Sequence, residues 1–197
     1  FGDITAVRTT FFNEEKTKIK GLDINFDYKK ILSNQTTLDL GINATHLFDY
    51  LTPEHEEEDH DDGHETHMVN RVGKFNYNAH THSLPRLRLN AFFGLTHDGI
   101  RYSVNTRYLD GYTNLRPLPA AAISSGYKNK VDSFLVFDIG ASKTFQIDNS
   151  ELKLGLHLMN AFDEEAPLLY DSPDFSFDTR LHDPRGRLIN LSLDYQF

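Results

Sequence analysis

The residues with the clearest chemical potential lie in one short acidic segment, residues 54–67. It carries eight carboxylates and four histidines without any Lys or Arg. The histidines are His55, His60, His64 and His67. Imidazole and carboxylate groups suit zinc or copper, and short His-rich tracts bind metal, so the segment is a candidate metal site. Its irregular spacing favours the alternative, a solvated acidic loop whose like charges repel one another.

Four arginines form a second group of candidates: Arg86, Arg88, Arg101 and Arg107. They fall on the polar side of the alternating pattern described below. An arginine cluster there would bind an anionic small-molecule substrate such as a ferric siderophore, because guanidinium groups match the geometry of anionic oxygens. Charge balance favours the alternative that these arginines pair with carboxylates such as Asp110 or Asp138.

Other chemistry is not indicated. The sequence has no Cys, no nucleophile elbow and no phosphate-cradling glycine loop, so we expect no enzyme and no cofactor beyond the metal considered above. The net charge is −9, and the segment 54–67 contributes eight of these negative charges. Because no basic stripe is present, we expect no nucleic-acid partner.

The elements that position these residues alternate with a period of two. Successive side chains of a strand point to opposite faces, so a strand between two different environments alternates apolar and polar residues. Seven segments show this pattern: 22–28, 37–44, 86–95, 100–108, 135–145, 152–158 and 189–197. Val7–Phe12 has the character of the tail of one more strand. The sequence therefore predicts an all-β fold of about eight antiparallel strands.

Strand and loop lengths indicate a membrane setting. The strands reach about 10 residues, as tilted membrane-crossing strands do, whereas ordinary strands have about 5–6. Tight turns at 32–35, 97–99 and 148–150 alternate with long connections at 51–83, 113–130 and 163–185. Outer-membrane barrels have short periplasmic turns and long extracellular loops. We therefore expect a transmembrane antiparallel β-barrel in outer-membrane lipid, with residues 51–83 as a long acidic, His-rich extracellular loop.

The C-terminal stretch carries a specific motif. It consists of Asn160-Ala161-Phe162-Asp163, then His182-Asp183-Pro184-Arg185-Gly186-Arg187, then a last strand that ends at Phe197. This combination resembles the end of TonB-dependent outer-membrane receptors, in which Asn-Leu-Phe-Asp closes the penultimate strand and Tyr-Asp-Pro-Arg-Gly-Arg opens the last. Ala161 stands where the family has Leu, and His182 where it has Tyr.

The resemblance implies a role in active uptake. Receptors of this family have a barrel of about 22 strands around a plug domain. This chain would then be the C-terminal third of the barrel, and the contacts with the TonB energy-coupling complex would lie in regions outside it. The implied substrate is a scarce nutrient: a ferric siderophore, a metal ion or its chelate, or an oligosaccharide. Tyr195 and Phe197 would belong to the signal that barrel-assembly machinery recognises.

Two other interpretations remain open. The first is a passive outer-membrane channel or complete small barrel, because about eight strands can close by themselves. The second is a soluble metal-binding β-domain, in which each alternating strand is half-buried in an ordinary core.

Overall fold

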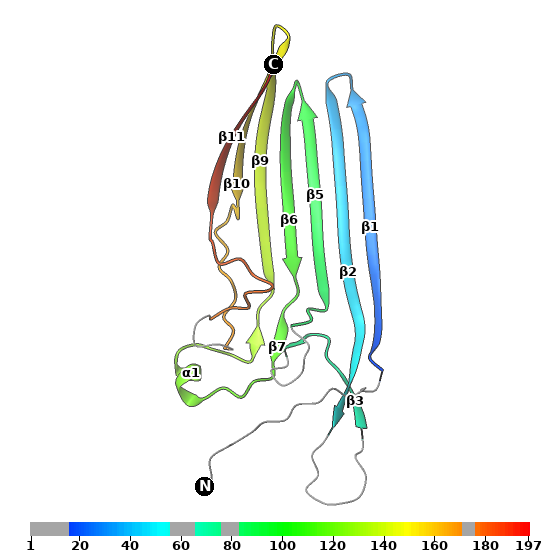
Figure 1. Cartoon of the computed structure of the whole chain (residues 1–197), viewed down its shortest axis with the longest axis vertical. Helices are drawn as coiled ribbons and strands as arrows, with labels where there is room; N and C mark the ends of the chain where they lie inside the picture. Colours follow the sequence, from blue (N-terminus) through cyan, green and yellow to red (C-terminus); the bar gives the residue numbers. More distant parts are fainter. Residues whose placement is uncertain (1–15, 56–65, 76–82, 171–175) are drawn as a thin grey trace, which may run out of the picture.

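The computed structural model describes residues 16–55, 66–75, 83–170 and 176–197. Its main element is one antiparallel sheet in the order β1-β2-β5-β6-β9-β10-β11 (Figure 1). The strands are β1 (Lys18–Ser33), β2 (Thr36–His55), β5 (Leu87–His97), β6 (Ile100–Leu109), β9 (Phe134–Ile147), β10 (Ser150–Met159) and β11 (Leu188–Gln196). An eighth strand, β3 (Thr66–Asn70), pairs with the far end of β2. The predicted all-β antiparallel fold is confirmed, and all seven alternating segments are strands. Val7–Phe12 lies outside the described residues.

The register of the sheet places most of the apolar residues of all seven strands on one face. One row across the sheet consists of Tyr28, Leu40, Phe93, Val104, Ile139, Leu158 and Ile189. The neighbouring row, displaced by one residue in every strand toward the same end of the sheet, consists of Lys29, Asp39, Gly94, Ser103, Gly140, His157 and Asn190. Because side chains alternate between faces, these two rows lie on opposite sides of the sheet. We call the two sides the apolar face and the polar face.

No layer of the described protein covers the apolar face. Leu191 is 80% exposed, Ile189 70% and Leu193 68%, although all three are large aliphatic residues. Leu154 and Ile139 are exposed as well. The sheet is therefore not half of a sandwich, whose inner faces would bury each other.

Tight turns join the strands at one end of the sheet (Figure 1). β5 and β6 are joined by Asp98-Gly99, whose φ values of 49° and 73° are those of the left-handed region. Asp-Gly is favoured at such two-residue hairpins because both central residues need positive φ. Asn34-Gln35 and Asp148-Asn149 make the other two connections at this end.

At the opposite end, the long connections fold onto one another. They contain β4 (Lys74–Phe75), β7 (Tyr112–Asn114), α1 (Ala120–Ser124) and β8 (Lys130–Val131), and β4, β7 and β8 form a second, three-stranded sheet. We call this part the cap; it comprises residues 71–75, 83–86, 110–133, 164–170 and 176–187.

The cap has its own hydrophobic core, made of Phe75, Tyr112, Val131 and Leu169 with Leu181 packed against it. The sequence predicted only loops at 51–83, 113–130 and 163–185. The structure differs: β2 continues to His55, β3 and β4 follow, and β7, α1 and β8 occupy the second connection. β4, β7 and β8 have only two or three residues each, which is too short to display alternation, so the sequence pattern does not reveal them.

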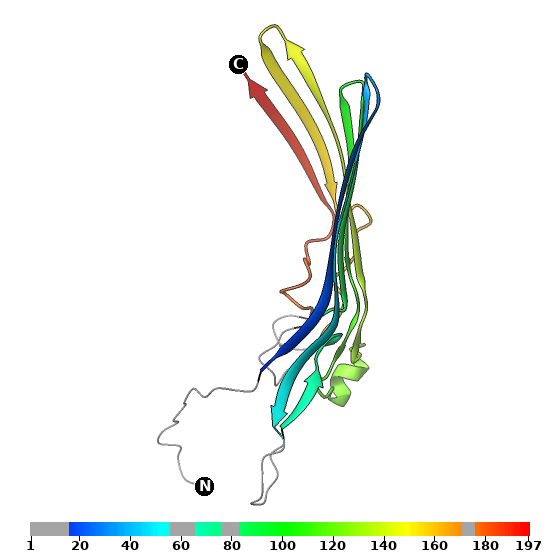
Figure 2. The ribbon, with the colours of Figure 1, turned by 90° about the vertical axis from the view of Figure 1, so that its right-hand side faces the viewer.

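The sheet is curved and open. Figure 2 shows β10 and β11 leaning to the side on which segment 176–187 lies, with α1 on the other side. Asp183 and Arg185 of that segment border the same small cavity as Arg107 and Val136, so the polar face is on the inner side of the curve. Within the described residues, β1 and β11 each have a neighbour on one side only, and no closed barrel is seen. No helix in the described part of the chain is long and apolar enough to cross a membrane.

Candidate functional site

A row of amide side chains lines a hollow in the polar face. Asn25, Asn43 and Asn90 are register partners on β1, β2 and β5, and Asn105 on β6 lies diagonally from Asn90 as the register partner of Phe92. The hollow has a volume of about 590 Å³. The Asn43 amide nitrogen donates to the Asn25 amide oxygen. The exposed side chains of Asn90 and Asn105 make no hydrogen bond to any other described residue, so their donors and acceptors are available to a ligand.

One aromatic side chain borders the hollow because a glycine makes room for it. A Cβ atom on Gly94 would come within 2.8 Å of the Phe92 ring and 3.1 Å of the Arg101 guanidinium. The Arg101 guanidinium lies 5.6 Å from the centre of the Phe92 ring and 2.8 Å from an Asp39 carboxylate oxygen. The Phe92 ring thus extends over Gly94 and gives the hollow an apolar wall.

A second glycine seats a histidine beside the hollow. A Cβ atom on Gly140 of β9 would lie 2.5 Å from Nδ1 of His157 and 2.8 Å from Oγ of Ser103. Atoms do not approach so closely without displacement. A glycine is therefore required at position 140, where the His157 ring lies over β9.

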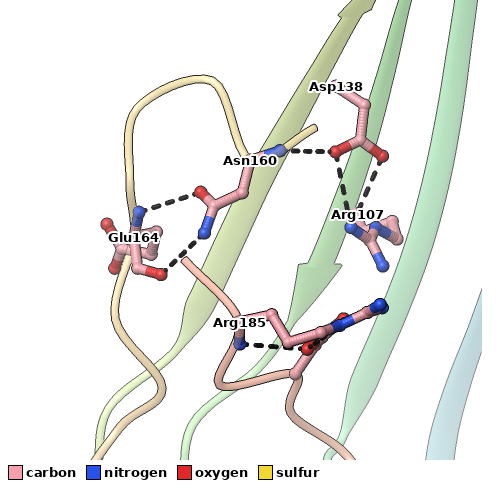
Figure 3. A network of polar contacts seen from close by, with 6 residues as sticks. Arg107, Asp138, Asn160, Glu164 and Arg185 are labelled. Carbon is pink, nitrogen blue, oxygen red and sulfur yellow. Dashed lines mark hydrogen bonds and ion pairs between the residues drawn. The ribbon is translucent and has the colours of Figure 1, made fainter. Parts of the chain in front are cut away.

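Two ion pairs stand where the polar face meets the cap (Figure 3). Arg107 of β6 lies 3.4 Å from Asp138 of β9, and Arg185 lies 2.6 Å from Asp183. The hydrogen bonds from Arg185 lower the pKa of Asp183 from 3.8 to about 2, and the charge of Arg107 contributes in the same direction. Each cation thus has a carboxylate beside it, and the group as a whole is charge-balanced.

The motif residues form a connected turn that ties this group together. Asn160 has a φ of 48°, donates from its side chain to the Glu164 carbonyl and accepts from the Glu164 backbone N–H (Figure 3). Its own backbone N–H donates to Asp138. Asp163 accepts from the backbone N–H of Arg187 at 2.7 Å. The two halves of the motif therefore link the end of β10 to the start of β11.

His182 lies inside the cap rather than on its surface. It is 6% exposed and packs edge-on against Phe134 with ring centres 5.1 Å apart. Burial lowers the pKa of His182 below 6.5, although the nearby Asp178 carboxylate acts in the opposite direction. Asp178 is also buried and accepts hydrogen bonds from the hydroxyl groups of Ser83 and Tyr112.

The four predicted arginines do not form a single cluster. Arg88 lies on the polar face of β5, opposite Thr45, and Arg86 immediately precedes that strand. Arg101 and Arg107 are six residues apart on β6, which is roughly 20 Å at the rise of a strand. Both are paired with a carboxylate, Arg101 with Asp39 and Arg107 with Asp138.

The predicted metal ligands lie only partly in the described residues. His60 and His64 fall outside them. His55 ends β2 and is the register partner of Thr66 on β3. His67 of β3 is the register partner of Glu54 in the same two-stranded ribbon of β2 and β3. The described residues contain no group of three or more His, Cys, Asp or Glu side chains arranged to hold a metal ion.

The predicted assembly residues lie at the turn end of β11. Tyr195 and Phe197 are exposed, and their ring centres are 6.2 Å apart. Tyr195 is the register partner of Leu152, and Leu193 on the same face is the partner of Leu154. These aromatic residues extend the apolar face to the end of the strand.

The sequence alone does not indicate the amide row, Phe92 or Asp183 as candidates. An isolated Asn in a strand carries no special signal, and only the register shows that three of them are neighbours. Asp183 stands out in the sequence only as part of the motif, and the basic residue Arg185 two positions later is the local signal of its ion pair.

Comparisons of the chain with protein-family models, with curated proteins and with solved structures find no match.

Proposed function

We propose that this chain is part of the wall of an outer-membrane β-barrel and belongs to the C-terminal portion of a TonB-dependent receptor that imports a scarce nutrient. The observation that carries the proposal is the broad apolar face, which spans seven strands with isolated polar residues such as Thr106 and Lys143, and which no layer of the described protein covers. In water such a face would drive association, because soluble monomers rarely expose large contiguous apolar patches. Lipid is the solvent that stabilises it.

The dimensions of the strands support a membrane setting. The seven strands of the main path run from 9 residues in β11 to 20 in β2. All meet the requirement of about 9–11 residues for a tilted strand to cross the hydrocarbon layer. Tight turns at one end and a folded cap at the other reproduce the asymmetry of outer-membrane barrels, with the cap on the extracellular side.

The C-terminal motif supports the receptor class in particular. Asn160 and Asp163 end β10, and Gly186 and Arg187 lead into β11, in the order that the family resemblance implies. Gly186 lies so close to Asp163 that a Cβ atom would meet the Asp163 carboxylate at 2.8 Å. The hydrogen bonds explain why a motif of this composition favours one connection geometry.

The open sheet favours a large barrel over the two alternatives. A complete small barrel requires β1 to pair with β11, whereas both present an unpaired edge in the described residues. An unpaired backbone group in lipid costs several kcal/mol, so a further strand at each edge is expected. A soluble metal-binding domain would have to cover the apolar face, and the cap leaves that face exposed.

Site-directed spin labelling tests the proposal directly, because the sequence has no Cys that would need to be removed. Single Cys substitutions at residues 189–193 are labelled in the protein reconstituted in lipid. We expect labels at 189, 191 and 193 to collide with lipid-soluble oxygen and labels at 190 and 192 with a water-soluble nickel chelate. Access of the nickel chelate to all five positions would refute a lipid-facing surface.

A further inference from the structure

We infer that the hollow in the polar face binds a neutral, hydroxyl-rich ligand of the carbohydrate class. The inference rests on the proposed function, because it names the class of substrate that the polar, inner face of the barrel wall would bind. Its elements are the amide row, the charges around it and the aromatic wall.

The amides of the hollow match hydroxyl groups. An amide offers both donors and an acceptor, as a sugar hydroxyl does, whereas a carboxylate only accepts and a guanidinium only donates. The side chains of Asn90 and Asn105 are exposed and make no hydrogen bond to any other described residue. Neighbouring strands are about 4.8 Å apart, so the amides of the row present repeated contacts along an extended ligand.

The charges around the hollow disfavour an anion. The titratable groups that line it are Asp27, Arg107 and Asp138, a formal net charge of −1. Arg107 lies against Asp138 and is also close enough to Asp183 to affect its pKa. Arg101 is paired with Asp39 in the same way. An anionic chelate would have to break these pairs and leave a carboxylate without its partner.

The wall of the hollow offers an apolar contact as well. Phe92 borders it next to Gly41, which presents no side chain. Carbohydrate rings have apolar C–H faces, which pack against an aromatic surface while their hydroxyl groups bind amides at the edges. A ligand with both features fits this lining better than a compact metal ion does.

Isothermal titration calorimetry of the full protein tests the inference, with lauryldimethylamine oxide as the detergent because it has no sugar headgroup. The probes are three trisaccharides that differ in charge: neutral cellotriose, anionic trigalacturonate and the cationic trimer of glucosamine. We expect cellotriose to bind most tightly and trigalacturonate most weakly. No heat with cellotriose up to about 10 mM, tighter binding of trigalacturonate, or preference for the cationic trimer would each overturn the inference.

Two variants connect the binding to the amide row. The double substitution Asn90→Ala/Asn105→Ala should weaken cellotriose binding by about tenfold or more, as two lost hydrogen bonds imply, while Asn190→Ala should change it less than about twofold. Asn190 is the matched control because it lies on the polar face of the sheet, in β11, and does not line the hollow. An equal loss in both variants would contradict the assignment.

The result is independent of the spin-label experiment. If labels 189–193 alternate and cellotriose does not bind, the membrane wall stands and only the ligand class is wrong. If the labels do not alternate, the receptor proposal fails whether or not the hollow binds sugar.

Discussion

The sheet and the cap are built from the same chain but bury their apolar residues in opposite ways. Of the ten buried apolar side chains among the described residues, seven belong to the cap, namely Val72, Phe75, Pro85, Tyr112, Ala122, Val131 and Leu169. Two more, Phe134 and Val136, lie where β9 meets the cap, and Ala44 alone lies within the sheet away from it. The cap buries its apolar residues in a core of its own, whereas the sheet leaves its apolar face exposed within the described protein.

Buried polar groups show the same contrast. In the cap, Asn114 is fully buried, and its side-chain amide donates to the Tyr170 carbonyl, while its oxygen accepts from the Arg116 N–H. Buried amides need such partners, because an unsatisfied one costs about 1–3 kcal/mol. On the sheet, the side chains of Asn90 and Asn105 stay exposed, and no other described residue forms a hydrogen bond with them. The hydrogen-bonded amide of Asn114 stabilises the cap, whereas the exposed amides of Asn90 and Asn105 are available to a ligand.

The largest expected effect comes from removing the same side chain from each region. Leu169→Ala in the cap, where Leu169 is 1% exposed, should destabilise the cap by about 2–5 kcal/mol because it leaves a cavity. Leu191→Ala on the sheet is the matched control and leaves no cavity. Hydrogen exchange of cap and strand amides in the two variants measures the difference. Equal protection losses in both regions would show that sheet and cap are a single cooperative unit.

An intermediate effect is expected inside the sheet at Gly140. Gly140→Ala should destabilise the protein by roughly 1–3 kcal/mol, because the added methyl group overlaps His157 and Ser103. Since the conflict is chiefly with the histidine ring, the double variant Gly140→Ala/His157→Ala should recover much of the loss. Heat-modifiable migration in gels measures both. If the double variant is no more stable than Gly140→Ala alone, the strain lies in the backbone rather than in the contact with the His157 ring.

The smallest effect is a dependence of cap stability on pH. The folded pKa of His182 lies below 6.5, so the unfolded cap takes up the proton first and stability falls as the pH drops below about 6.5. The folded pKa of Asp183 is about 2 against 3.8 unfolded, so its stabilising contribution is complete above 3.8 and is lost between 3.8 and about 2. Near-ultraviolet circular dichroism of a pH titration follows both steps.

Two substitutions separate the steps of that titration. His182→Tyr, which introduces the residue that the family resemblance has at this position, should remove the histidine step, which lies below pH 6.5, and leave the acid one. Asp183→Asn should do the reverse. If His182→Tyr leaves the whole profile unchanged, burial of the imidazole is not what couples the cap to pH.

The sheet was predictable from the sequence because it repeats one simple pattern. Alternation along 22–28 or 189–197 identifies a strand without knowledge of its neighbours, and Asp98-Gly99 identifies a hairpin by its backbone requirement. The cap was not predictable in this way. Its core joins Phe75, Tyr112 and Leu169, which come from three separate connections, and nothing local indicates that they meet.

The candidate site was predictable only in part, for a related reason. The motif at 160–163 and 182–187 drew attention to Asn160 and Asp163, and the structure gives them a hydrogen-bonding role. The contact of His157 with Gly140 and the pairing of Asn25 with Asn43 depend on the register of the strands. A shift of the register by one residue would abolish both contacts. Alternation defines which face a residue occupies but not which residue lies beside it.

The great length of β2 has an electrostatic consequence. Asn43, in the hollow, and Glu54, on the ribbon with β3, stand eleven residues apart on this strand, which is roughly 35 Å. The screening length at physiological ionic strength is only about 8 Å. Counterions therefore isolate the charge at the far end of the ribbon from the hollow, and added salt acts on the two places as if they were on separate molecules.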